Sequence, residues 1–346
     1  MTIPDSITAI AVGAFDSCRI TSVVIPASVT DIANYAFSEC TSLTSLKLGE
    51  NVKTIGYEAF SECTSLTAVT LPASLTAYNA SFTGCTALTA FTVADGSTAF
   101  CAADGILYAK DMKTLVQCPG GLTAVNIPDG VIHIETEACC EGILISAVIP
   151  DSVTAVRDNA FRSCAALTAV YVGSGVTSFG YKAFDHGFYA ADGSKLSGTA
   201  IAGHCYQLGK AGSADGFILY DGSLVTVTAG AGGTVTGGGL YADGASVTVT
   251  AKAADGYSFA GWYSGSTKIS EEAAYTFSLA GNAAYSAQFS KNAAPGGGDG
   301  GSGDGGSNEG GNGSNTWVWI AVVVVVILVV LLAVYFLFIR TGKLKL

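Results

Sequence analysis

The chain has 346 residues, which is enough for two or three domains. Only 12% of its residues are charged, and its formal net charge at pH 7 is −11. Because nucleic acids are bound mainly by Lys and Arg side chains that neutralise phosphates, this acidic composition excludes a nucleic-acid-binding protein. No signal peptide is visible at Met1, so we expect a leader and a capping turn to be encoded upstream.

A motif of 22 or 23 residues recurs along the first half of the chain. Its central slot holds Cys139 once and is otherwise occupied by Phe15, Phe37, Phe60, Phe82, Phe161 and Phe184. A unit of this length is too short to enclose a core, so its apolar side chains can leave water only by stacking against the neighbouring units. The sequence therefore predicts a solenoid of seven coils.

Each unit combines a short strand with a turn on the opposite side of the coil. Residues 43–48 and 66–71 alternate Leu or Val with small polar residues, which predicts strands of one parallel sheet. In the Ala-Phe-x-x-Cys segment, Phe and Cys are three residues apart, so we expect both on one face of a short helical turn. The Pro-x-Ser motif marks the bend between the two sides, since Pro fixes its own φ.

Ten cysteines are present, but their spacing argues against a metal site. One group keeps the slot three residues after the phenylalanine, which is a repeat signature rather than the CxxC pairing of zinc sites. We expect the members of this group to be buried free thiols that act as small apolar side chains: Cys18, Cys40, Cys63, Cys85 and Cys164. The disulfide state of the others stays open at this point: Cys101, Cys118, Cys139, Cys140 and Cys205.

The segment IPASVTDIANYAFSECTSLTSLKL and its copies resemble the BspA-type leucine-rich repeat of microbial surface proteins. The resemblance implies a curved solenoid on a cell surface that contacts host proteins, matrix or other cells, and it implies no catalytic residues. We assign leucine-rich repeats to residues 1–93 and 122–188. The predicted fold class is a β-rich α/β solenoid with a parallel sheet, followed by a small β-grasp-like domain and one transmembrane helix.

Two irregular segments interrupt or follow the repeats. The insertion at residues 94–121 contains apolar stretches at 106–108, directly after Asp104-Gly105, and at 114–116. These stretches predict a β-hairpin packed on the solenoid edge rather than a dedicated ligand loop. Cys101 and Cys118 could pair across this hairpin. Residues 189–223 are rich in Asp-Gly and Ser-Gly turns, and we expect them to cap the apolar end of the last coil.

Residues 224–290 alternate Val and Thr and contain many aromatic residues, which indicates half-buried strands. The segment around Gly256-Tyr257, Phe259 and Gly261-Trp262 resembles the small β-grasp repeat of bacterial surface proteins, the internalin B-repeat of the Listeria-Bacteroides type. The resemblance implies a stalk or a weak adhesion element. We expect its aromatic side chains to form a core rather than a ligand platform.

The C-terminal part predicts attachment to a membrane. A Gly-rich linker at residues 291–316 precedes 23 uncharged apolar residues at 317–339, which as a helix would span a bilayer and contact its lipid. By the positive-inside rule, the tail at 340–346 is cytoplasmic. We therefore predict a single-pass protein of the cell membrane with an extracellular N-terminal region. The predicted membrane anchors are Trp317, Trp319, Arg340, Lys343 and Lys345.

No catalytic, cofactor-binding or metal-binding residue is predicted. The three histidines, His133, His186 and His204, lie outside HExxH and GxSxG motifs, and the sequence contains no P-loop. We therefore predict that the protein is not an enzyme and uses no cofactor. An ectoenzyme that depends on His133 or His204 is the least favoured of three hypotheses.

The leading hypothesis is a cell-surface interaction or adhesion protein that binds an extracellular protein or glycan through its sheet. Alternation along the strands points one set of side chains outward: Thr44, Ser45, Lys47, Thr67, Ala68, Thr70, Thr168, Ala169 and Tyr171. This face is poor in Arg, Trp and Tyr, the residues that usually dominate binding energy. The alternative is therefore a structural envelope or stalk protein without a single specific ligand.

Overall fold

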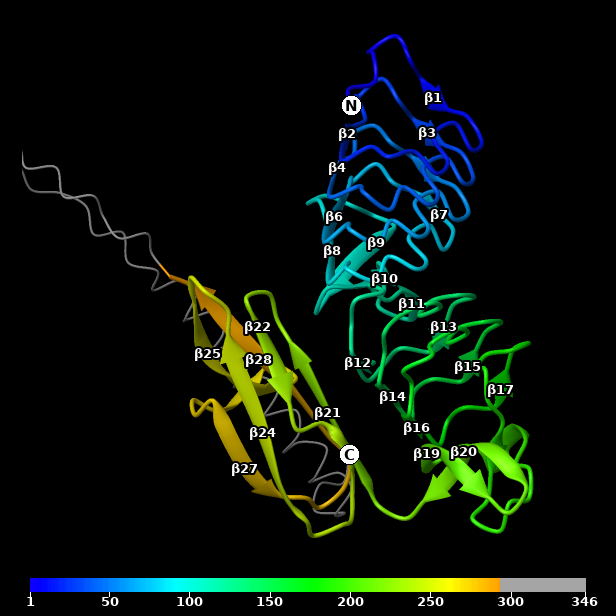
Figure 1. The fold of residues 1–346 in the computed structure, drawn as a ribbon, viewed down its shortest axis with the longest axis vertical. Coiled ribbons are helices and arrows are strands. Elements are labelled where there is room, and N and C mark those ends of the chain that lie inside the picture. The colour runs from blue at the N-terminus through cyan, green and yellow to red at the C-terminus, as the bar shows by residue number, and fades with distance from the viewer. Residues whose placement is uncertain (293–346) are drawn as a thin grey trace, which may run out of the picture. The chain divides into compact units, whose positions relative to one another are not determined.

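The computed structural model describes residues 1–292, in which short coils stack one upon another along the first part of the chain (Figure 1). Each regular coil places one strand on each of two opposite sides. We call the side of the Leu-rich strands the front ladder and the other side the back ladder. The first stack, residues 1–93, has the front strands β2 (Ser22–Val24), β4 (Ser45–Lys47), β6 (Ala68–Leu71) and β8 (Ala90–Val93). Its back strands are β1 (Ala9–Ile10), β3 (Asp31–Ile32), β5 (Thr54–Ile55) and β7 (Ala77–Tyr78).

Both ladders are parallel, and alternation sets which side chains they bury. In the front ladder Val23 is in register with Leu46, and Val69 is in register with Phe91, with all four facing the core. In the back ladder Ile10, Ile32 and Ile55 stack in the same way. The prediction that the Leu-rich strands form one parallel sheet is corrected, because β2-β4, β6-β8 and β12-β14-β16 belong to three separate sheets and each regular coil adds a second strand to the back ladder.

The predicted helical turns are wrong, and with them the α/β fold class. Within residues 1–292 the single helix is a 3₁₀ turn, η1 (Gly198–Ala200). Each Ala-Phe-x-x-Cys turn contains two residues with positive φ, such as Tyr35 at 59° and Glu39 at 55°, which a right-handed helix does not accommodate. The turn amides bond to the next coil instead, as Phe37 N does to Ala59 O at 2.7 Å.

The regular period nevertheless produces the expected stack of side chains. The rings of Phe15, Phe37, Phe60 and Phe82 lie face to face, with centroids 4.9, 5.1 and 5.0 Å apart. Beside them, the Cys40 thiol donates to Phe15 O at 3.1 Å, and the Cys63 thiol donates to Phe37 O at 3.3 Å. All five cysteines of the repeated slot are free thiols, and all except the half-buried Cys18 are buried.

The insertion joins the first stack to a second stack at residues 114–188. Its strands are β9 (Phe100–Ala103), β10 (Ile106–Ala109) and β11 (Thr114–Gln117), and β10 pairs antiparallel with both neighbours. Strand β11 also begins the second back ladder, which continues with β13 (His133–Ile134), β15 (Ala155–Val156) and β17 (Ser178–Phe179). The second front ladder consists of β12 (Ala124–Asn126), β14 (Ser146–Ile149) and β16 (Ala169–Val172).

The last coil is followed by an antiparallel hairpin. Strand β19 (His204–Ala211) pairs with β16 and with β20 (Ala214–Tyr220), and β20 pairs with β18 (Phe188–Tyr189). Phe217 of β20 is buried and contacts Phe184 edge to face, with centroids 5.9 Å apart. The hairpin thus covers the end of the phenylalanine stack.

A small all-β domain follows the solenoid. One sheet has the order β23-β21-β28-β25-β26, and the other has the order β22-β24-β27. Trp262 is fully buried between them, and its Nε1 donates to Ala273 O at 3.2 Å. The strands are β21 (Ser223–Ala229), β22 (Gly233–Thr236), β23 (Gly239–Tyr241), β24 (Ser246–Ala253), β25 (Tyr257–Ser264), β26 (Thr267–Ser270), β27 (Ala274–Ser278) and β28 (Ala283–Lys291).

The prediction of a single-pass membrane protein is not upheld, and we withdraw it. Across residues 1–292 the structure contains no helix with the length and apolar character needed to cross a bilayer. The predicted span at 317–339, its anchor residues and the tail at 340–346 lie outside the described residues.

Candidate binding surface

The front ladder of the first stack presents an open row of side chains. Six of the nine predicted contact residues belong to it, and all six are exposed: Thr44, Ser45, Lys47, Thr67, Ala68 and Thr70. The parallel register extends the row to the neighbouring strands, with Val24 beside Lys47 and Thr92 beside Thr70. The structure thus brings these six residues together on one side of adjacent coils.

Hydroxyl groups on this face are already held by the backbone of the preceding coil. Thr44 Oγ1 donates to Thr21 O at 3.0 Å, and Thr89 Oγ1 donates to Thr67 O at 3.3 Å. The hydroxyls of Thr70 and Thr92 lie 2.8 Å apart. Because these side chains are ordered before any ligand arrives, binding on this face carries a small cost in conformational entropy.

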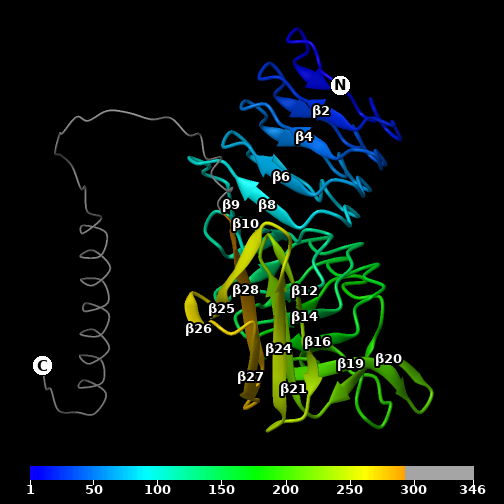
Figure 2. The same ribbon diagram turned by 60° about the vertical axis from the view of Figure 1, so that its left-hand side comes forward.

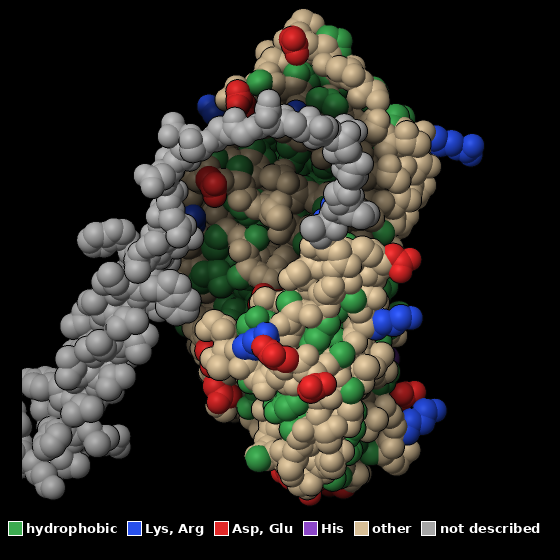
Figure 3. All heavy atoms as spheres, turned by 90° about the vertical axis from the view of Figure 1, so that its left-hand side faces the viewer, with side chains coloured by type: hydrophobic (Ala, Val, Ile, Leu, Met, Phe, Trp, Pro, Cys, Tyr) green, Lys and Arg blue, Asp and Glu red, His purple; other side chains and the backbone are tan. Residues whose placement is uncertain are grey.

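The face carries little charge. Lys47 is the one charged residue among the outward positions of β2, β4, β6 and β8, and Val24 is 41% exposed. Figure 3, which looks onto the side of the molecule that carries these strands, shows mainly uncharged surface with single charges scattered over it. Such a surface does not steer a ligand by its electric field, so it fits flat, short-range contact.

The other three predicted contact residues are in a different environment. Thr168 is exposed, whereas Ala169 is buried and Tyr171 is half-buried. The cause is strand β21 of the C-terminal domain, which packs across β12, β14 and β16 (Figure 2). The repeat pattern gives no sign of this contact, because it carries no information about where a separate domain packs.

The contact with the C-terminal domain has an apolar centre and a polar edge. Leu224 is fully buried in a cluster with Val148, Ala169 and Cys205. Asn282 Oδ1 accepts a hydrogen bond from Leu224 N at 2.8 Å and one from the Cys205 thiol at 3.4 Å. The second front ladder is therefore largely an internal interface.

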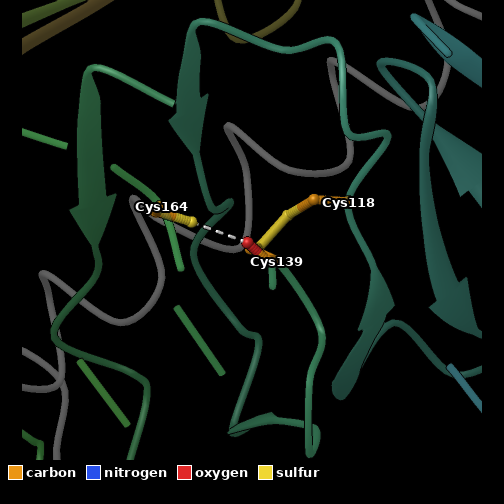
Figure 4. The surroundings of a disulfide bond; sticks show 3 residues. All are labelled: Cys118, Cys139 and Cys164. Carbon is orange, nitrogen blue, oxygen red and sulfur yellow. Dashed lines mark hydrogen bonds between the residues drawn. A yellow bond between two sulfur atoms is a disulfide. The ribbon is translucent and has the colours of Figure 1, made fainter. Parts of the chain in front are cut away.

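A disulfide connects the first two coils of the second stack (Figure 4). It joins Cys118 to Cys139 across a Cα–Cα distance of 4.9 Å, and both residues are buried. The Cys164 thiol donates to Cys139 O at 2.9 Å. Cys101, the partner considered for Cys118 from the sequence, is a free thiol.

One sequence signal could have indicated this pairing. Cys139 occupies the phenylalanine slot, and the coil that begins at Thr114 lacks its own Ala-Phe turn. These two adjacent coils therefore lack the ring-on-ring contact that joins other coils, and a disulfide can link them in its place.

The buried thiols are not activated nucleophiles. Burial raises the pKa of Cys140 to about 12, and it raises the pKa of Cys164 to about 11. Both thiols are therefore protonated at neutral pH. No group of three or more His, Cys, Asp or Glu residues in the described part of the chain is arranged to hold a metal ion.

Two family models match the chain. The model of the BspA type leucine rich repeat region matches residues 1–102 and 114–189 in six copies. The model of the divergent InlB B-repeat domain matches residues 223–293. Neither model indicates a catalytic family. No curated protein matches the chain.

Solved structures similar to this chain are bacterial leucine-rich-repeat proteins. The pneumococcal vaccine antigen PcpA shares 21% identity over 51% of each chain, with a TM-score of 0.44. A leucine-rich repeat protein from Eubacterium ventriosum shares 25% identity over 52% of this chain and 55% of its own, with a TM-score of 0.43. A leucine rich cell surface protein from Faecalibacterium prausnitzii shares 21% identity over 52% of this chain and 86% of its own, with a TM-score of 0.22. The matched region spans about half the length of the first two proteins.

Proposed function

Since this chain belongs to the family of proteins with BspA-type leucine-rich repeats and carries a divergent InlB B-repeat domain, we propose that it is a surface interaction or adhesion protein. Its ligand is an extracellular protein or glycan. The contact surface is the front ladder of the first stack, centred on β4 and β6. The residues that make the contact are Thr44, Ser45, Lys47, Thr67, Ala68 and Thr70.

The observation that carries this proposal is the difference in exposure between the two front ladders. The ladder of the second stack is covered by β21, whereas Ser45, Lys47, Ala68 and Thr70 in the first stack are exposed. Repetition places similar side chains at regular intervals, so a repetitive or extended ligand can contact several coils at once. Several weak contacts of this kind add up to a useful total affinity.

A bulky substitution on this ladder tests the proposal. Ala68→Arg places a long side chain in the middle of the exposed row, and we expect adhesion of beads coated with the full chain to immobilised extracellular-matrix protein to fall at least tenfold. Ala77→Arg is the matched control, because Ala77 is also exposed in a strand but lies on the back ladder. If both variants adhere as well as the unmodified protein does, the front ladder is not the contact surface.

The second candidate is a structural envelope or stalk component without a single ligand. It is favoured by the composition of the front ladder, whose outward positions on β2, β4, β6 and β8 contain no Arg, Trp or Tyr. In that case the unmodified protein shows no saturable adhesion to any surface, and Ala68→Arg changes nothing. If adhesion is saturable and Ala68→Arg abolishes it, the result favours the interaction protein over the structural component.

A further inference from the structure

A concave site lies at the far end of the second stack, next to η1. It has a volume of about 360 Å³, within the range of ~300 to 1,000 Å³ that is usual for small-ligand sites. Its walls come from the loop that follows β17 and from the segment at residues 195–201. It lies on a different part of the solenoid from the front ladder of the first stack, and the proposed function does not use it.

One wall of the site is apolar. Phe179 and Leu196 are half-buried and line it together with the buried Ile201. Tyr181, which precedes the lining residue Lys182, is 71% exposed, and Lys182 Nζ lies 5.5 Å from the centre of its ring. Tyr181 itself lies outside the lining, so the apolar and aromatic surface of the site comes from Phe179, Leu196 and Ile201.

The opposite rim is polar and contains both signs of charge. Lys182 and Lys195 supply two exposed ammonium groups, and Asp185 supplies a carboxylate. Ser197 adds a hydroxyl group. Cations next to a hydrogen-bond acceptor suit a ligand that combines an anionic group with hydroxyl groups.

A second hollow of about 430 Å³ adjoins the first and shares Lys182 and Asp185 with it. Arg162 and Ser163 complete its lining. Arg162 already pairs with Glu141 at 3.2 Å, yet its Nε is buried and has no hydrogen-bond acceptor within the described residues. Because this nitrogen is closed to solvent, a ligand in the hollow does not reach it while the Arg162 side chain keeps its position.

We propose that this end of the solenoid binds a carboxylated sugar, a hexuronate residue of a glycan. The apolar face of the ring packs on Phe179 and Leu196. The carboxylate lies between Lys182 and Lys195, and the ring hydroxyls donate to Asp185. An inorganic phosphate ion fits less well, because it has no apolar face and would leave the apolar wall unused.

Isothermal titration calorimetry with methyl glucuronide and the full chain tests this proposal, with methyl glucoside as the neutral counterpart. We expect the glucuronide to bind at least tenfold more tightly, since it adds charge-assisted hydrogen bonds to two lysines. The difference should shrink as salt is added, because both ammonium groups are exposed and are screened. Equal affinity for the two sugars, or no detectable binding of either, would overturn the proposal.

Matched variants locate the site. Lys195→Gln should weaken glucuronide binding at least fivefold, whereas Lys210→Gln, at an exposed position of β19 outside the site, should leave it unchanged. Lys182→Asn should also weaken binding, and asparagine tolerates the positive φ of 48° at that position. Equal losses in Lys195→Gln and Lys210→Gln would mean that the sugar binds elsewhere. Ala68→Arg should keep full glucuronide binding, because Ala68 lies outside this site. The glucuronide proposal and the front-ladder proposal can therefore fail independently of each other.

Discussion

The two stacks of this solenoid are built from the same repeat, yet they differ in what holds them together and in what covers them. In the first stack, four phenylalanine rings form an unbroken column, and the front ladder is exposed. In the second stack Cys139 replaces a ring, a disulfide links it to Cys118, and β21 covers the front ladder. The comparison shows that one sequence pattern can form a binding surface or an internal interface, depending on its neighbour in space.

The largest loss of stability is expected from a substitution at the centre of the first stack. Phe60→Ala removes a ring that stacks on Phe37 and Phe82, and we expect a loss of about 3–5 kcal/mol in the free energy of unfolding. Phe15→Ala should cost less, because Phe15 is half-buried and stacks on one ring only. Urea unfolding measures both losses. If the two losses are equal, stacking against rings on both sides does not stabilise Phe60 more than stacking on one side stabilises Phe15.

A smaller effect is expected from the covalent link of the second stack. The Cys118→Ala/Cys139→Ala double variant should lose about 3 kcal/mol, the loop-closure value for a bridge of this span. Addition of dithiothreitol should lower the melting temperature of the unmodified protein and leave that of the double variant unchanged. A thiol titration of the unfolded protein without reductant should give eight free cysteines, and ten would disprove the bridge.

The smallest effect concerns the cover over the second front ladder. Asn282→Ala removes the acceptor for Leu224 N, and we expect a cost of about 1–2 kcal/mol that is confined to the contact between domain and solenoid. Amide hydrogen exchange in β16 should become faster, while exchange in β4 and β6 stays the same. The exposed Asn79 provides the control variant Asn79→Ala. Unchanged exchange in β16 would mean that β21 does not protect this ladder.

Much of the stack was predictable from local spacing. The slots of Phe37, Cys40 and Leu43 recur in each regular unit, and all three residues are buried as the period required. The alternation around Leu46 correctly placed Ser45 and Lys47 on the exposed side. The helical turn was mispredicted, because a spacing of three residues does not reveal that Glu39 adopts a positive φ and that the turn amides bond to the next coil.

The sequence alone determined that these units must stack, since a coil of 22 or 23 residues has no interior of its own and can bury Phe60 only against the coils beside it. It also determined which side of each strand faces water before any other domain is considered. Only the tertiary structure decided that Ala169 lies under β21, that Cys118 pairs with Cys139, and that Lys182 and Lys195 meet at one concave site. These results depend on distances between segments far apart in the chain, and a local repeat carries no information about such distances.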